Sequence, residues 1–570
     1  MDWVFDLWDI NNYKHSVSKY IKLPPALFQQ RELEVLTNVN IESGNSEHRF
    51  NLQQLDNQLK GCEYYTKLKL TEPGRQLIYK GTMKKRYCAG ESSDLQVFLF
   101  DHVLLMVKTK EVDKIEQYKI YRKPIPLELL ATSITENIQN ISKPTSIFLA
   151  KAPAIVNNIR DKQYALTFTC IGKKGFSATL YASTIISRNK WIEHIEKQQQ
   201  FLLDRTQVFE KTTFLEGKYF VGTNKVNCIA FFDDYQKLAL GTEEGVYVAD
   251  IGQNPKQPIQ VLHLEKVSQI AVLEEFRLLL ILADKIFYWL PVEALDLEDT
   301  NSSNKKPRKI TSNTSFFKYG VCLGKTLIAV VITAGLTQSI IRTFEPIESI
   351  KSKMKGSILN EALKAYKDFC IPRKSISIHF LKKSLCVGCT KGFEIINMET
   401  LATQTLLDPA DATLDFVQKR ENVKPIALFR IPNSRGDHLL CYDEFAFYVN
   451  KVGWRSRHDW HITWEGAPTS FAFREPYLLA FEPSFIEIRN VKTGLLEQII
   501  KGHNLRCLCS DNRGNILVAT NVPTSGCSEV FSLNLADGRR SSLLSDAISI
   551  ATTIVAPEES GNNGKSDSAE

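Results

Sequence analysis

A pattern of short apolar strands recurs about seven times along the second half of the chain. Each unit contains an apolar strand, a turn and further strands, and no linker separates the units, which disfavours two β-sandwiches. The spacing of roughly 35–60 residues brackets the ~40–50 residues of a propeller blade. The repeat therefore predicts a mainly β fold with a closed seven-bladed β-propeller over residues 220–540. The predicted units begin at Val226, Val267, Phe316, Ser375, Lys424, Pro468 and Asn504.

A second strand pattern covers residues 61–205. Apolar positions recur with period two, as in strands that bury one face. Tight turns at Asp101-His102 and Gly172–Gly175 predict antiparallel hairpins. We expect about seven short strands, interrupted by a looped insertion from Ala131 to Arg160.

A helix is predicted after these strands. Ser183 or Thr184 would provide its N-cap, and Ile185, Trp191 and Ile195 can face one side. Short strands followed by one helix with a central Trp resemble a pleckstrin-homology (PH) domain. In that family the strands form a small barrel, and the last helix closes one end of it. The resemblance implies that Trp191 packs in the core and has a structural role.

The ends of the chain carry weaker signals. Residues 1–30 are aromatic and irregular and remain unassigned. Residues 31–60 are rich in helix formers, with leucines at helical spacing that include Leu52 and Leu55. Residues 556–570 are polar and are predicted to be disordered.

Two insertions interrupt the predicted propeller. A polar segment around Lys305–Lys309 is predicted to be a solvated loop between the second and third units, with nuclear targeting or a contact with anionic lipid as alternatives. Residues 352–369 show helical spacing and are predicted to precede the fourth unit as a helix.

The composition excludes several classes of protein. The 71 Lys and Arg exceed the 64 Asp and Glu by 7, which is too small an excess for a nucleic-acid binder of 570 residues. The 12 Cys have no regular spacing, and acidic residues near the start replace the basic residues of a secretory signal, so a cytoplasmic location is expected. The uncharged run 326–341 is shorter than the ~20 residues that a membrane helix needs.

No catalytic constellation, cofactor or metal is predicted. The chain contains neither of the glycine-rich phosphate-binding motifs GxxxxGK[ST] and GxGxxG. Its histidines show no arrangement with Ser and Asp that suggests a catalytic triad. Cys386 and Cys389 form a CxxC, but a zinc site needs four ligands and a redox site needs a helix beginning at the motif. We expect both thiols to be buried on a strand.

The propeller region also resembles a known family. SISIHFLKKSLCVGCTKGFEIINM, HLLCYDEFAFYVNKVGWR and SFAFREPYLLAFEPSFIEIRNV resemble the citron-homology (CNH) domain of fungal Rho-type guanine nucleotide exchange factors. In that family a catalytic Dbl-homology domain precedes the PH and CNH domains. Residues 31–60 resemble the end of that catalytic domain. The resemblance implies a Rho-type GTPase or its regulators as partners.

The same resemblance leads to a functional expectation. Exchange requires a rigid helical face that binds the nucleotide-free GTPase better than the loaded one, and one terminal helix cannot provide it. We therefore expect a non-catalytic regulatory or targeting protein of Rho signalling. The alternatives are an active exchange factor of which this chain is a truncated piece, and a vesicle-tethering propeller.

Two surfaces are predicted to bind partners. Lys84, Lys85 and Arg86 end the first strand of the PH-like region, where clustered cations can bind phosphoinositides and recruit the protein to the plasma membrane. A solvated strand end is the alternative, because Asp94 is close in sequence. In the propeller, Trp454, Arg455 and Trp460 belong to an aromatic cluster that forms either core or a protein-docking surface.

Overall fold

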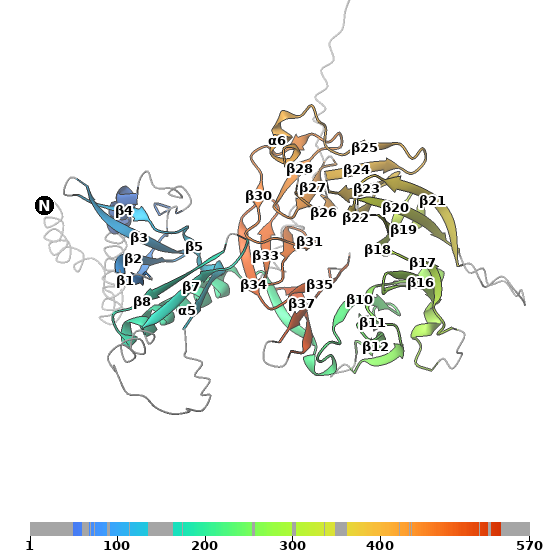
Figure 1. Ribbon diagram of the computed structural model, residues 1–570, viewed down its shortest axis with the longest axis horizontal. Coiled ribbons are helices and arrows are strands. Elements are labelled where there is room, and N and C mark those ends of the chain that lie inside the picture. Colours follow the sequence, from blue (N-terminus) through green and yellow to red (C-terminus); the bar gives the residue numbers. More distant parts are fainter. Residues whose placement is uncertain are drawn as a thin grey trace, which may run out of the picture. The chain divides into compact units, whose positions relative to one another are not determined.

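The computed structural model describes two compact units (Figure 1). The first comprises the described residues up to Phe201 apart from 171–175, and the second contains the rest. The sequence predictions for residues 1–48, for most of the insertion between 131 and 160 and for the tail lie outside the described residues. The described ranges are 49–59, 68–134, 164–298, 304–347 and 362–536, with gaps at 69, 73, 88–91, 113–114, 174, 253–256, 336, 391, 421, 433, 435, 512–513 and 523–525.

The first unit is an antiparallel sheet that curls around an apolar core. Its strand order is β4-β3-β2-β1-β8-β7-β6, and β5 pairs with β3. The hairpin turns predicted at Asp101-His102 and at 172–175 are confirmed. The strands are β1 (Leu77–Arg86), β2 (Ser92–Phe100), β3 (Val103–Val112), β4 (Ile115–Ile120), β5 (Ile125–Pro126), β6 (Leu130–Ser133), β7 (Ala165–Cys170) and β8 (Phe176–Tyr181).

The helix α5 (Ile185–Thr206) follows the last of these strands. The Thr184 hydroxyl accepts a hydrogen bond from the Ser187 amide at 3.0 Å, so Thr184 caps the helix as predicted. Trp191 is 1% exposed, and its ring centroid lies 4.7 Å from that of Tyr79. Ile185 differs from the prediction, because it is 40% exposed at the first turn of the helix.

A helix over residues 49–59 packs on the same unit. Leu52, Leu55 and Leu59 are buried together with residues of β2 and β3 such as Phe100 and Leu105. The predicted helical spacing of the leucines is confirmed. The apolar side of this helix is therefore part of the core of the first unit.

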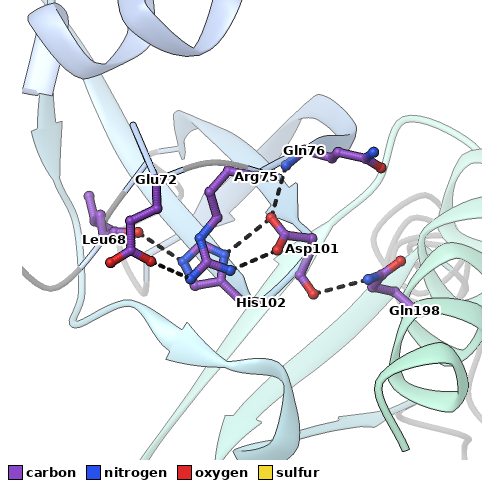
Figure 2. Close-up of polar contacts among 7 residues, drawn as sticks. All are labelled: Leu68, Glu72, Arg75, Gln76, Asp101, His102 and Gln198. Carbon is purple, nitrogen blue, oxygen red and sulfur yellow. Dashed lines mark hydrogen bonds and ion pairs between the residues drawn. The ribbon is translucent and has the colours of Figure 1, made fainter. Parts of the chain in front are cut away.

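A polar network joins the segment before β1 to the turn between β2 and β3 (Figure 2). Arg75 lies 2.8 Å from the Asp101 carboxylate, and Gln198 of α5 donates to the carbonyl oxygen of Asp101 at 3.0 Å. His102 Nε2 lies 2.8 Å from the carbonyl oxygen of Leu68. Burial raises the pKa of Asp101, but hydrogen bonds, the strongest of them with His102, lower it to about 2.

The second unit contains seven antiparallel sheets, which confirms the predicted seven-bladed propeller (Figure 1). The observed blade starts differ from the predicted ones by at most two residues, as for Phe316 against Thr314. The second strand of each blade is rich in buried apolar residues. All residues of β15, which reads LLLILA, are buried, because neighbouring blades cover both of its faces.

The first four blades have the following strands. Blade 1 contains β10 (Val226–Phe232), β11 (Lys237–Thr242), β12 (Val246–Asp250) and β13 (Ile259–Leu262). Blade 2 contains β14 (Val267–Leu273), β15 (Leu278–Ala283), β16 (Ile286–Pro291) and β17 (Arg308–Thr311). Blade 3 contains β18 (Thr314–Cys322), β19 (Lys325–Ala334), β20 (Gln338–Pro346) and β21 (Leu363–Ile371). Blade 4 contains β22 (Ser375–Phe380), β23 (Ser384–Cys389), β24 (Gly392–Asn397) and β25 (Thr403–Thr405).

The remaining blades continue around the ring. The short helix α6 (Asp415–Gln418) precedes blade 5, which contains β26 (Pro425–Arg430), β27 (His438–Tyr442), β28 (Phe445–Val449) and β29 (Arg455–Ser456), with β30 (Ile462–Thr463) also paired to β28. Blade 6 contains β31 (Ser470–Arg474), β32 (Tyr477–Phe481), β33 (Phe485–Asn490) and β34 (Leu496–Lys501). Blade 7 contains β35 (Arg506–Ser510), β36 (Ile516–Asn521), β37 (Ser528–Leu535) and β9 (Phe209–Leu215).

Blade 7 combines strands from both ends of the unit. Its outer strand β9 precedes the first blade in sequence and pairs antiparallel with β37. Gln498 of β34 holds the start of β9, because its Oε1 accepts from the amides of Val208 and Phe209 at 3.0 and 2.8 Å. Its Nε2 donates to the Phe209 carbonyl oxygen at 3.0 Å. This pairing closes the ring and leaves β37 with a partner.

Two predicted insertions are corrected. Arg308 and Lys309 belong to β17 rather than to a loop, and Arg308 lies over the Trp289 ring at 4.4 Å. Residues 363–369 are part of β21 rather than of a helix, because they pair with β20 along the outer edge of blade 3. Pairing with β16 makes a strand of the polar segment at the first edge, and pairing with β20 outweighs local helix propensity at the second.

No helix in the described parts of the chain combines the length and apolar character needed to cross a membrane.

Candidate functional site

The predicted basic strand end is divided by the pleat of β1. Successive side chains of a strand point to opposite faces, so Lys85 faces away from Lys84 and Arg86. Lys84 lies directly across from Asp94 of β2, and Arg86 lies over the ring of Tyr181 at 4.4 Å. The three cations therefore do not converge on one point.

Lys85 instead shares a site with Lys108 of β3 around the exposed Tyr87. The Tyr87 hydroxyl lies 3.2 Å from the Ser93 hydroxyl. This hydrogen bond, followed by the positive charges of Lys108 and Lys85, lowers the pKa of Tyr87. Both ammonium groups thus act on one phenol.

Arg122 extends this group of cations, although it was not among the predicted site residues. Its guanidinium lies 5.7 Å from the Tyr121 ring centroid, and Lys108 Nζ lies 5.6 Å from the same centroid. Arg122 also lies 5.8 Å from the ring of Phe176. Lys85, Lys108 and Arg122 are called the basic rim below. They come from β1, β3 and the segment after β4.

Lys110 and Lys114 are not included in the rim. Lys110 lies opposite Gln117 in the pairing of β3 with β4, and Lys114 is outside the described residues. The sequence signal for Arg122 is the run YRKP at 121–124, which directly follows β4. Its proximity to Lys108 depends on the pairing of β3 with β4, which the run itself does not specify.

The predicted docking residues of the propeller have different environments. Trp460 is 8% exposed and packs on Tyr448, with ring centroids 4.4 Å apart, so it belongs to the core of blade 5. Trp454 is 44% exposed, and its Nε1 donates to Asp408 at 3.0 Å. The Arg455 guanidinium lies 5.0 Å from the ring centroid of Phe416. Trp454 is therefore the member of this set with a large exposed ring.

The cysteine pair lies inside blade 4. Cys386 and Cys389 are fully buried on β23 and are not joined by a disulfide. Burial raises the pKa of Cys389 to about 12, and that of Cys386 is also raised, so both remain thiols at neutral pH. Within the described ranges, no group of three or more His, Cys, Asp or Glu is arranged to hold a metal.

Comparisons with known proteins assign both units. The "Pleckstrin homology domain" family matches residues 77–199, and the "CNH domain" family matches residues 234–511. The chain is 42% identical to the solved "AfRom2 CNH domain". The match covers 57% of this chain and 100% of that structure, with a TM-score of 0.52.

Curated relatives match across both units. The chain is 44% identical over 499 residues to "Rho1 guanine nucleotide exchange factor 1" of Schizosaccharomyces pombe. This alignment covers 84% of this chain and 37% of that protein. The chain is also 31% identical over 520 residues to "RHO1 GDP-GTP exchange protein 2" of Saccharomyces cerevisiae, in an alignment that covers 86% of this chain and 37% of that protein. The chain thus spans about two fifths of the relatives it matches. Its described residues contain a PH domain followed by a CNH propeller, and the chain is homologous to part of fungal Rho1 guanine nucleotide exchange factors.

Proposed function

We propose that this chain acts in Rho-type GTPase signalling as a regulatory and targeting protein without exchange activity of its own. In this proposal the PH domain binds phosphoinositides at the cytoplasmic face of the plasma membrane, and the CNH propeller docks proteins, either the GTPase or its regulators. The observation that carries the proposal is the basic rim, where Lys85, Lys108 and Arg122 gather beside the exposed ring of Tyr87 and the half-buried ring of Tyr121.

The chemistry of the rim suits an anionic headgroup. Phosphate oxygens accept charge-assisted hydrogen bonds from Lys and Arg, and Arg can bind two oxygens at once. Each cation near an anionic membrane contributes about 1 kcal/mol. Tyr87 has an apolar ring and a polar hydroxyl, which suits the boundary between headgroups and acyl chains. The rim is therefore expected to bind a membrane through several weak contacts.

Changing Lys85, Lys108 and Arg122 together to Ala should weaken binding to phosphoinositide vesicles by roughly 10–100-fold, because three favourable charges are lost. Co-sedimentation with vesicles that contain phosphatidylinositol 4,5-bisphosphate measures the effect. The matched control changes three exposed lysines of the same unit, Lys80, Lys190 and Lys197, to Ala. Equal losses in both triple variants, or unaltered binding in the rim variant, would show that the rim is not the lipid site.

The helix over residues 49–59 supports the proposed lack of exchange activity. Its leucines pack into the core of the PH domain, so its apolar side is not available to a GTPase. The purified chain is therefore expected to leave the release of fluorescent GDP from a Rho-type GTPase at its spontaneous rate. A stopped-flow measurement with excess chain tests this. Acceleration would contradict the proposal and favour an exchange factor.

A further inference from the structure

A cavity of about 1280 Å³ opens in the propeller where the innermost strands of blades 3, 4 and 5 end. The strands β18, β22 and β26 lie side by side (Figure 1). Residues of all three strands line the cavity. The volume exceeds the roughly 300–1,000 Å³ of a typical small-molecule pocket. The cavity can therefore hold several residues of a peptide.

The lining is strongly cationic. It includes Lys318, Lys382, Lys383, Arg430 and Lys451, and its carboxylate comes from Glu399. Glu399 lies 3.8 Å from Lys383. The other four cations come from three blades, and none of them has a carboxylate within ion-pair distance among the described residues. The described lining residues therefore carry an excess of positive charge.

Two ionisable groups at the cavity are shifted toward their neutral forms, chiefly by burial. Lys318 is exposed at the cavity, but burial by the surrounding protein lowers the pKa of its ammonium. Burial and then the charge of Lys318 lower the pKa of His379 to about 3. His379 Nε2 is buried without a hydrogen-bond partner in the described structure. An anion in the cavity would stabilise both groups in their charged forms.

The cavity also exposes apolar side chains. Tyr319 is 47% exposed and Val321 is 63% exposed on β18, and both line the cavity beside Phe380 of β22. A compact polyanion would gain no binding free energy from these apolar side chains, because it has no apolar surface to bury against them. A peptide that carries carboxylates together with an apolar residue uses both features.

We propose that this cavity binds an acidic peptide segment of a protein partner, with carboxylates at Lys382, Arg430 and Lys451 and an apolar side chain against Tyr319 and Val321. The site lies on the propeller alone and does not depend on lipid binding by the PH domain. The charges give specificity and speed the encounter, and the apolar contact adds affinity as it loses water.

The test uses a fluorescein-labelled peptide of twelve residues made of Glu and Asp with two central Leu, measured by fluorescence anisotropy with the full chain. The charge-reversed variant carries Lys382→Glu, two residues after β22, and Arg430→Glu, at the end of β26; both residues line the cavity. The control variant carries Lys374→Glu and Lys424→Glu, which immediately precede the same two strands. Both variants change the net charge equally.

Saturable binding is expected, with the charge-reversed variant weakened by roughly 30-fold or more and the control by less than about 3-fold. Val321→Asn should weaken the Leu-containing peptide but not one with Ser in place of both Leu. Equal losses in both reversed variants, or equal binding of a Gln and Asn peptide, would overturn the proposal. Tight binding of inositol hexakisphosphate without binding of the peptide would also overturn it. If charge reversal prevents folding, Lys382→Gln with Arg430→Gln replaces it and should weaken binding in the same direction.

Discussion

Gln498→Leu is expected to lower the free energy of unfolding of the propeller by about 3–5 kcal/mol, because three buried backbone groups would lose their partners at about 1–3 kcal/mol each. These groups are the amides of Val208 and Phe209 and the carbonyl of Phe209. Gln498 itself is buried, and leucine cannot replace either of its hydrogen-bonding functions. Urea denaturation followed by circular dichroism measures the loss.

Hydrogen exchange adds a local readout for this variant. Amides of β9 should exchange faster than those of the inner strands, because the substitution loosens the start of the closing strand. The matched control is Gln404→Leu, since Gln404 is exposed on the outer strand β25 of blade 4. A Gln498→Leu protein as stable as this control would show that the glutamine does not hold β9.

Trp191→Ala is expected to destabilise the PH domain by about 3–5 kcal/mol, the usual loss for a large aromatic residue in a core. The indole packs edge-on against Tyr79 and Phe168, with ring centroids 4.7 and 6.4 Å away. A side-chain carbon at Gly81 would lie 3.6 Å from the indole, which shows how closely β1 approaches it. Removing the ring leaves a cavity between α5 and the sheet.

Differential scanning calorimetry measures this effect, because the PH transition should move to lower temperature while the propeller transition stays in place. Trp454→Ala provides the control. Its ring is largely exposed, and its one hydrogen bond goes to Asp408. A control loss above about 1.5 kcal/mol, or no shift of the PH transition in Trp191→Ala, would contradict the interpretation.

The seven blades could be predicted because each one is local. A blade's inner strands follow one another through short turns, so their apolar runs and turn residues are visible in sequence. The closing strand β9 could not be found this way, since its partner β37 lies more than 300 residues later. The outer strands β17 and β21 were missed for a related reason. Their edges are polar, and only pairing with β16 and β20 makes them strands.

The candidate lipid site could be predicted only in part. A basic strand end was visible, but the prediction treated Lys84, Lys85 and Arg86 as one cluster, whereas the alternation of a strand separates them. Lys85 joins Lys108 and Arg122 only after β1, β2, β3 and β4 have paired. The cavity of the propeller is less visible still, because its cations come from three blades.

The covalent path between the two units has a mechanical consequence. α5 ends at Thr206 and β9 begins at Phe209, so two residues connect the last helix of the PH domain to the strand that completes blade 7. Tension that travels along the chain through α5 would therefore reach β9 within two residues. The start of β9 is the part of this closing strand that such a load reaches first, and the three hydrogen bonds of Gln498 are made there.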